Sequence, residues 1–251
     1  MSASLPTVRL RGHAFWAPGF DSLEHFVAGE VDDSVKKPPL AFVPSRMRRA
    51  TSLATRMAVE CAHRAVHAAG FDLANTATVF GSQHGEIQIA VDQMVMMEDG
   101  EGQISPARFK NSVHNTAAGL FSITAENKGF TTALAGGDFT FALSLLEGLA
   151  LLKAGDATHL VVVCTDEALP TPIEGFSSHR DVSIAVAFSV EGDAGPALGL
   201  PTGRSETTPV GAVPSYLESH AAAAAFRLIE AARAGAKGAL ALDERWQVVL
   251  S

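Results

Sequence analysis

Only two cysteines occur in the 251 residues, Cys61 and Cys164. So few thiols cannot build a disulfide framework, and reduced thiols in the cytoplasm are the default. The first residues lack the apolar core of a signal peptide, and the longest apolar run, residues 139–152, is too short to span a bilayer. We therefore expect a cytoplasmic protein without a membrane span.

The signatures of several function classes are also missing. The net charge is −8 and no basic stripe is present, which argues against binding to nucleic acid. The nine histidines are dispersed, without HExxH, CxxC or paired-carboxylate spacing. The chain has no Walker loop, no GxGxxG and no GxSxG turn. We therefore expect no metal ion and no cofactor.

What the chain does contain is an alternation of strand and helix patterns, typical of a mixed α/β layered domain. Strands are predicted at residues 8–10, 76–80, 131–135, 159–164 and 182–190, with a closing hairpin at 239–242 and 246–250. Helices are predicted at residues 45–69, 86–98, 111–123, 139–154 and 217–234, with a loop and then a helix over 13–30 and a loop over 192–214.

Residues 131–152 organise the chain: a short strand pattern, the turn Gly136-Gly137-Asp138 and a long apolar helix. Turns of this kind display one side chain at the end of a buried strand, and in many enzymes it is the nucleophile. Aspartate is also a preferred N-cap, worth about 1 kcal/mol. A capping carboxylate has a lowered pKa and is a poor general acid. We interpret Asp138 as a helix cap, with catalysis as the alternative.

Two thiols remain to be assigned. Cys61 lies on the apolar face of the predicted helix 45–69, and we expect it to be packed in the core. Cys164 ends a buried strand, where a thiol is exposed if the strand end borders a crevice. A core cysteine is the preferred interpretation there too.

Four segments carry a resemblance to a known family. They are SRMRRATSLATRMAVECAHRAV, the turn GSQHGE, the run ISPARFKNSVHNTAAGLFSI with Asn115, Ala118 and Gly119, and GFTTALAGGDFTFALSLLEGLALLKAGDA. In order and spacing they resemble the N-terminal half of β-ketoacyl-acyl-carrier-protein synthases. Nine residues separate Gly129 from Asp138, and seventeen separate Asp138 from Gly155, as in that family. The resemblance therefore implies that Asp138 occupies the position of the nucleophilic cysteine.

Two departures from the family pattern follow. No thiol lies near Asp138 in the sequence, and the chain largely lacks the C-terminal half that carries the family's catalytic histidine pair and lysine. His220 precedes the last predicted helix, but no motif transfers a catalytic role to it. The NSVHNTAAG motif is most similar to half-length β-ketoacyl synthase-like proteins of aryl polyene and xanthomonadin-type clusters. The resemblance covers residues 45–193 well and the ends poorly.

The resemblance implies an α/β, thiolase-like layered α-β-α fold with a mixed five-stranded sheet, the N-terminal half of a ketosynthase. We expect a single domain over residues 1–251, with a core at 45–193 and a truncated remnant of the C-terminal half at 194–251. The function implied is that of a non-catalytic chain-length-factor subunit. It would pair with a full ketosynthase in type II polyketide or aryl polyene biosynthesis, which resembles fatty-acid synthesis.

The resemblance also implies which residues meet the partner. Strand residues Thr131, Thr132, Ala133 and Leu134, followed by Gly136 and Gly137, would form an antiparallel seam across a pseudo-twofold axis. Residues 109–120 would line the partner's acyl tunnel, with Phe109 and His114 as the tunnel stop and Asn111 and Asn115 beside them. For His114, an ordinary surface or interface histidine is the alternative. The acyl carrier protein would dock mainly on the ketosynthase.

Two other functions remain open. One is an unusual acyl-thioester enzyme, an acyltransferase, decarboxylase or thioesterase, that uses Asp138 and His114. The other is a self-associating remnant, a homodimer, that serves only as a scaffold.

Overall fold

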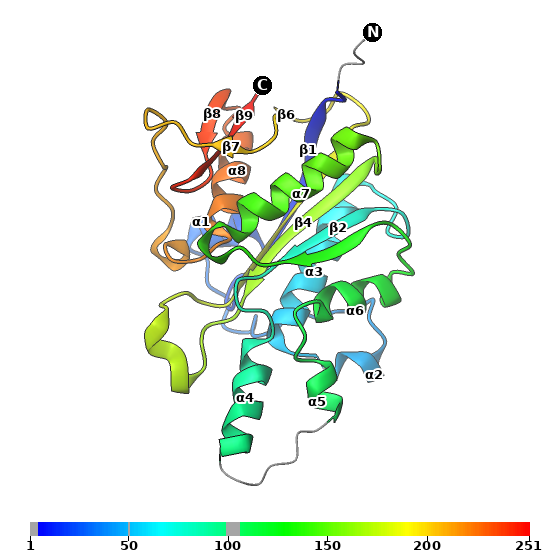
Figure 1. Ribbon diagram of the computed structural model, residues 1–251, viewed down its shortest axis with the longest axis vertical. Coiled ribbons are helices and arrows are strands. Elements are labelled where there is room, and N and C mark those ends of the chain that lie inside the picture. Colours follow the sequence, from blue (N-terminus) through cyan, green and yellow to red (C-terminus); the bar gives the residue numbers. More distant parts are fainter. Residues whose placement is uncertain (1–4, 50, 99–105) are drawn as a thin grey trace.

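A mixed β-sheet runs through the computed structural model (Figure 1), which describes residues 5–49, 51–98 and 106–251. Within these residues its strand order is β3-β2-β4-β5-β1-β6-β9-β7, and β8 pairs with β9. The strands are β1 (Val8–Trp16), β2 (Ala77–Gly81), β3 (Thr131–Leu134), β4 (His159–Asp166), β5 (Val182–Ser189), β6 (Ala197–Leu198), β7 (Thr202–Gly203), β8 (Gly238–Ala241) and β9 (Trp246–Leu250).

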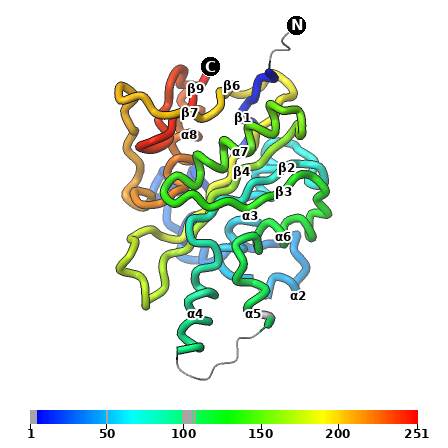
Figure 2. Tube along the Cα trace, in the orientation of Figure 1, coloured from blue at the N-terminus to red at the C-terminus, as the bar shows by residue number. Residues whose placement is uncertain are grey.

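The five strands β3-β2-β4-β5-β1 form the mixed core of the sheet. β2 pairs in parallel with both β3 and β4, whereas β5 pairs antiparallel with β4 and β1. The short strands near the C-terminus extend the sheet beyond β1. Figure 2 shows that the C-terminus lies at the same end of the molecule as the start of β1. The mixed α/β class expected from the sequence is confirmed.

Helices cover both faces of this sheet and make three layers. They are α1 (Leu23–Ala28), α2 (Ser45–Arg48), α3 (Leu53–Ala69), α4 (Ile87–Glu98), α5 (Pro106–Lys110), α6 (Thr116–Thr124), α7 (Thr140–Ala154) and α8 (Ala223–Arg233). α7 and α8 pack on one face, and α3 and α6 on the other.

The alternation of side chains along β5 explains the two faces. Ile184, Val186 and Phe188 belong to the core cluster with α7 and α8. Ala185 and Ala187 face the opposite way, into the cluster with α3. Large side chains on one face and alanines on the other are both fully buried, because helices cover both sides of the strand.

β1 is longer than the three residues predicted from the sequence. It pairs with β5 from Arg9↔Ser189 to Trp16↔Ser183, so the predicted loop at residue 13 is a strand. The helix in this region begins only at Leu23, where Ser22 Oγ accepts a hydrogen bond from His25 N. Residues 11–16 extend the strand because they pair with β5, a segment distant in the chain, and no local pattern reveals that pairing.

The predicted continuous helix over residues 45–69 is wrong at its N-terminal end. The structure has the single turn α2 and then α3, whose N-cap Ser52 accepts a 2.9 Å hydrogen bond from Thr55 N. A serine that bonds to the backbone in this way starts a new helix instead of continuing the old one. The predicted C-terminal end at residue 69 is confirmed, and Gly70 at the C-cap has φ +69°.

The predicted helices over residues 111–123 and 217–234 are shorter in the structure. α6 begins at Thr116, after a turn in which Ser112 Oγ donates to Phe109 O. α8 begins at Ala223, and a 3₁₀ turn covers Ser215–Leu217. The loop predicted at 192–214 contains β6 and β7, which pair with strands distant in the sequence.

Candidate functional site

The turn between β3 and α7 is built from two glycines and a threonine. Gly137 has φ +59°, a conformation that favours glycine. Thr140 Oγ1 accepts a 3.0 Å hydrogen bond from Gly136 N and donates one of 2.6 Å to Gly137 O. These bonds fold residues 137–139 into a 3₁₀ turn and display Asp138 at the end of the strand.

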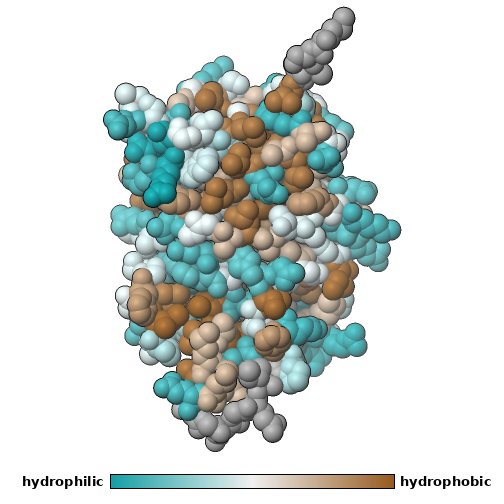
Figure 3. Space-filling model, in the orientation of Figure 1, coloured by the Kyte–Doolittle hydropathy of each residue, from teal (hydrophilic) through white to brown (hydrophobic). Residues whose placement is uncertain are grey.

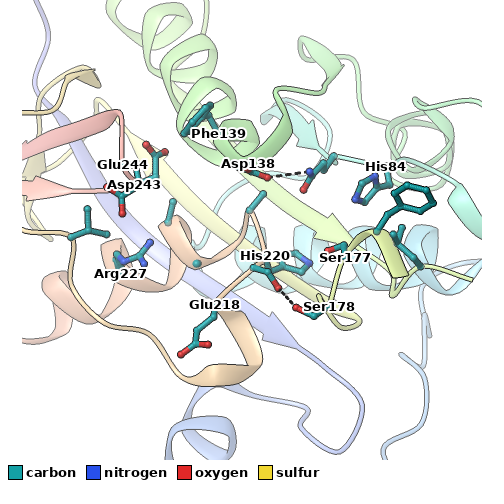
Figure 4. Close-up of a pocket in the computed structure, with 18 of the residues that line it drawn as sticks. His84, Asp138, Phe139, Ser177, Ser178, Glu218, His220, Arg227, Asp243 and Glu244 are labelled. Atoms are coloured by element: carbon teal, nitrogen blue, oxygen red, sulfur yellow. Dashed lines mark hydrogen bonds between the residues drawn. The ribbon is translucent and has the colours of Figure 1, made fainter. Parts of the chain in front are cut away.

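Asp138 is not the helix cap that the sequence predicted. The N-cap of α7 is Phe139, and no side chain of the described residues caps this end. Thr140 closes the turn instead, which leaves the exposed Asp138 carboxylate free to reach across to the β2–α4 turn. There Gln83 Nε2 donates a 3.2 Å hydrogen bond to Asp138 Oδ1 (Figure 4).

Asp138 faces an open cavity of about 870 Å³. Its walls come from the β2–α4 turn, the loop after β4, the start of α8 and the β8–β9 turn. Figure 4 shows Asp138 and His220 on one side of this space and Arg227, Asp243 and Glu244 on the other. The guanidinium carbon of Arg245 lies 4.9 Å from the centre of the Phe139 ring, which joins the C-terminal hairpin to the Asp138 turn.

Three histidines stand in a row beside the cavity. The rings of His84 and His179 are stacked at 4.8 Å, and the rings of His179 and His220 meet edge-on at 5.4 Å. Their Nε2 atoms are buried and have no hydrogen-bond partner among the described residues. His84 and His220 line the cavity directly, whereas His179 lies behind them.

His220 is a neutral hydrogen-bond donor at physiological pH. Burial lowers its pKa to about 4, although the nearby Asp166 acts in the opposite direction. Its Nδ1 accepts a 2.9 Å hydrogen bond from Ala222 N, so the single proton of the neutral ring lies on Nε2. Among the described residues this buried N–H makes no well-aligned hydrogen bond, and the backbone of Asp166 is a weak partner for it, so an acceptor atom in the cavity would satisfy it better.

Asp166 stabilises the β2–α4 turn, which carries Gln83 and His84 and forms one wall of the cavity. Its carboxylate accepts hydrogen bonds from Ser82 Oγ at 2.7 Å, Gln83 N at 2.9 Å and His84 N at 2.8 Å. It lies at the end of β4 and is buried. The sequence reasoning missed this residue, although an acidic side chain directly after a buried strand was the available signal.

Two buried carboxyl groups lie at the N-terminus of α3, next to a much smaller cavity of about 20 Å³. Glu86 Oε1 accepts from Thr55 Oγ1, and Glu167 Oε1 accepts a 2.9 Å hydrogen bond from Ala54 N. Burial raises the pKa of both, and that of Glu167 reaches about 7, partly through repulsion by Glu86. No motif in the sequence pointed to either residue.

The structure separates His114 from Asp138. His114 lines the smaller cavity, and its Nε2 lies 2.9 Å from Ser82 O. Asp138 lines the larger one, together with His220. The pair proposed from the sequence for an acyl-thioester enzyme is therefore not in one cavity, and His220 is the histidine in the cavity of Asp138.

The remaining predicted site residues lie on two exposed features. Phe109, on α5, is 59% exposed, and Asn111 and Asn115 lie in and after the turn that follows it. Asn115 is the N-cap position of α6 but makes no side-chain capping bond. Thr131, Thr132, Ala133 and Leu134 form β3, the edge strand of the sheet, and Gly136 and Gly137 belong to the turn after it.

Both cysteines are inert core residues, as the sequence predicted. Cys61 on α3 and Cys164 on β4 are fully buried. Burial raises the pKa of Cys61 to about 12 and that of Cys164 well above its ordinary value. Neither thiol lines the cavity of Asp138.

In residues 5–49, 51–98 and 106–251, no group of three or more His, Cys, Asp or Glu side chains is arranged to hold a metal ion. Over the same residues, no helix has the length and apolar character needed to cross a bilayer.

Residues 26–243 match the family model described as β-ketoacyl synthase, N-terminal domain. The chain belongs to the β-ketoacyl synthase family. The match includes the Asp138 turn, the histidine row and most of the C-terminal segment. No curated protein matches this β-ketoacyl synthase-family chain.

Solved ketosynthase structures share its fold. The ketosynthase (ApeO) in complex with its chain length factor (ApeC) from Xenorhabdus doucetiae superposes with a TM-score of 0.72 at 20% identity, covering 97% of this chain and 99% of that one. The ishigamide ketosynthase/chain length factor gives a TM-score of 0.62 at 17% identity, with coverages of 92% and 74%.

A third structure is described as AntDE:AntF, a type II PKS acyl-carrier protein in complex with its ketosynthase bound to the hexaketide. It gives a TM-score of 0.62 at 10% identity and covers 74% of this chain and 63% of that one. At these identities the likeness shows the fold. The thiolase-like ketosynthase fold expected from the sequence is confirmed.

Proposed function

We propose that this chain is a non-catalytic chain length factor. It pairs with a full-length ketosynthase in a type II polyketide or aryl polyene system and shapes the acyl tunnel of that partner. The observation that carries the proposal is Asp138, which stands on the turn where the resemblance puts the nucleophilic cysteine. A carboxylate there would form a reactive anhydride with a thioester, a poor intermediate for condensation.

The thiols support the proposal. Condensation by a ketosynthase needs an accessible thiolate, and a thiol is nucleophilic only when deprotonated. The two cysteines of the chain are both fully buried, with raised pKa values, on α3 and β4. A partner subunit therefore supplies the nucleophile.

The open edge of the sheet supports the pairing. Among the described residues, β3 is an edge strand whose single pairing is with β2. On the side that faces β2, Phe130 O accepts a hydrogen bond from Thr78 N, and Leu134 O accepts one from Ser82 N. Because backbone groups alternate along a strand, those of Thr131 and Ala133 point away from β2. A partner strand would satisfy them, and exposed edges of this kind are normally protected.

The apolar surface near α4 and α5 supports the tunnel role. Met94 is 65% exposed, Met97 57% and Phe109 59%. Figure 3 shows apolar side chains on the lower part of the molecule, where Figure 1 places these two helices. In the proposed complex, Phe109 enters the partner's tunnel as its stop. His114, the other residue expected at the tunnel stop, has its Nε2 2.9 Å from Ser82 O of its own chain.

The proposal also covers the domain organisation of the chain, its oligomeric state and the docking of the carrier protein. Residues 1–251 are one domain, of which 194–251 are the remnant of a C-terminal ketosynthase half. The protein acts in the cytoplasm as a heterodimer, and the acyl carrier protein docks on the ketosynthase. The described complexes of ketosynthases with chain length factors or carrier protein are the structural analogy for this arrangement.

The test has two stages. The chain purified alone is offered acyl- and malonyl-carrier protein, and it is then co-expressed and purified with a full-length ketosynthase from the same genome. We expect no turnover by the chain alone, co-purification of the two, and longer products when Phe109→Ala enlarges the tunnel. Val31→Ala is the matched control, because Val31 is an equally exposed apolar residue, 63% exposed, away from these helices.

Two experimental results would contradict different parts of the proposed function. Unchanged product lengths in Phe109→Ala would reject the tunnel role and favour the scaffold function. Turnover by the isolated chain would reject the non-catalytic assignment.

The second candidate is an acyl-thioester enzyme that uses Asp138 with His220. The observation that favours it is their shared cavity, in which the buried Nε2–H of His220 has no well-aligned partner among the described residues. That N–H would polarise a thioester carbonyl while Asp138 acts on the acyl group. Turnover that is present in the isolated chain and lost in Asp138→Asn would establish it, and inactivity of the wild-type chain would exclude it.

A further inference from the structure

Two histidines lie one helical turn apart on the outer surface of α3. His63 and His67 are at positions i and i+4, so their side chains project from the same face of the helix. Their Nε2 atoms are 3.0 Å apart. His67 is exposed and His63 is half-buried, so solvent reaches the pair.

Neighbouring groups fix one of these rings in place. Phe42 stacks on the His63 ring at 3.9 Å with an interplanar angle of only 7°. The helix beneath is firmly built, with a side-chain cap at Ser52 and a left-handed glycine at its end. The first ligand is therefore held by packing, and only the exposed His67 must adjust.

The separation of the two nitrogens fits two ligands of one metal ion. Zinc–imidazole bonds are about 2.0–2.1 Å long, so two neighbouring ligands on a tetrahedral or square-planar ion lie about 2.9–3.4 Å apart. The observed 3.0 Å lies within this interval. The two nitrogens are within hydrogen-bond distance of each other, and a bound ion would replace the proton between them.

The two imidazoles supply the ligands of this site without a third protein group. The carboxylate of Glu60, about one turn before His63 on α3, is engaged elsewhere. It accepts a 2.8 Å hydrogen bond from Arg64 Nε and one of 3.0 Å from Leu40 N. It therefore does not serve as a third ligand.

We propose that His63 and His67 form a bidentate surface site for a divalent transition-metal ion. Two imidazoles select Cu²⁺ over Ni²⁺ and Zn²⁺, and water fills the remaining positions of the ion. The bound ion links two side chains one turn apart on α3. Through His63, it also stabilises the packing of Phe42 against the helix. None of the residues lining the cavity of Asp138 belongs to α3, so this site is separate from the one already described.

The test uses the full chain without an affinity tag. Isothermal titration with Cu²⁺ and with Zn²⁺ is compared for wild type, His67→Ala, His63→Ala and His25→Ala. His25 is the matched control, an exposed histidine whose Nδ1 lies 2.8 Å from Asp21 one turn away. We expect one strong site per chain in wild type and His25→Ala, and affinity at least tenfold weaker in the other two.

A second measurement guards against misfolding of His63→Ala, which loses its contact with Phe42. The Cu²⁺ electron paramagnetic resonance spectrum should report two imidazole nitrogens in wild type and one in His67→Ala. Zn²⁺ should raise the Tm of wild type but not of His67→Ala. Equal affinities in wild type and His67→Ala, or spectra without two nitrogens, would mean an adventitious ion only and would overturn the proposal.

Discussion

Ser82 Oγ donates a 2.7 Å hydrogen bond to Asp166 Oδ1 across 84 residues of sequence. This bond joins the residue after β2 to the last residue of β4, two strands that run parallel side by side. Ser82 Oγ also accepts a 2.7 Å hydrogen bond from Gly85 N, which closes the turn. The β2–α4 turn, which carries Gln83 toward Asp138, is therefore held in place by a hydrogen bond between the ends of two neighbouring strands.

Replacing this carboxylate should destabilise the fold. In Asp166→Asn, an amide NH₂ replaces one of the oxygens that accept from Ser82, Gln83 and His84, so at least one buried donor loses its partner. We expect the free energy of unfolding to fall by about 2–4 kcal/mol, measured by urea denaturation. The control Asp156→Asn, at an exposed position, should change it little. Equal effects of the two changes would contradict this account.

The seam proposed for β3 predicts a selective effect of proline. In Ala133→Pro, the backbone N–H that points away from β2 is removed, while the hydrogen bonds to β2 survive. We expect the chain to stay folded by circular dichroism but to lose at least tenfold in affinity for the ketosynthase, measured by titration calorimetry. Ala133→Ser keeps the N–H and should bind normally. Undiminished binding by a folded Ala133→Pro would place the seam elsewhere.

The buried Glu167 predicts a pH dependence of stability. Its pKa is raised by burial from 4.5 to about 7, so the folded state keeps a proton that the unfolded state releases. Its contribution to stability is therefore complete below pH 4.5 and is lost as the pH rises through about 7. Glutamine has no proton to lose. The stability of Glu167→Gln relative to wild type should thus grow by about 3 kcal/mol over this range.

Denaturation at a series of pH values measures this difference. Glu174→Gln is the control, because Glu174 is exposed, and its curve should run parallel to that of wild type. Burial shifts the pKa of His220 the opposite way, but His220 is present in all three proteins, so its effect cancels in the comparison. A Glu167→Gln curve parallel to wild type would disprove the prediction.

Two glycine-to-alanine changes in helices should have opposite signs. A Cβ at Gly148 on α7 would lie 2.5 Å from Cδ2 of the fully buried Leu160 on β4, whereas one at Gly119 on α6 would meet nothing within 4 Å. We expect Gly148→Ala to lose about 1–2 kcal/mol, because overpacking outweighs the gain in helix propensity. Gly119→Ala should gain up to about 1 kcal/mol. Urea denaturation of the isolated chain compares them, and equal signs would refute the packing argument.

Local patterns predicted much of the framework. The buried apolar runs of β4 and β5 and the closing hairpin β8–β9 were recognisable, because their residues suit strands whatever their neighbours. β1 was underestimated because its strand character depends on pairing with β5, which lies far away in the chain. The short strands β6 and β7 have no local signal at all and exist only as partners of β1 and β9.

The candidate site divides in the same way. The sequence alone determined that Asp138 follows two glycines between a strand and a helix, that no cysteine is near it, and that Cys61 and Cys164 belong in apolar elements, because order and composition are local properties. Only the tertiary structure decided that Thr140 and not Asp138 closes the turn, and that His220 rather than His114 shares the cavity of Asp138. Those outcomes depend on how β2, β4 and the C-terminal segment meet in space, and contacts between distant segments are set by packing of the whole core.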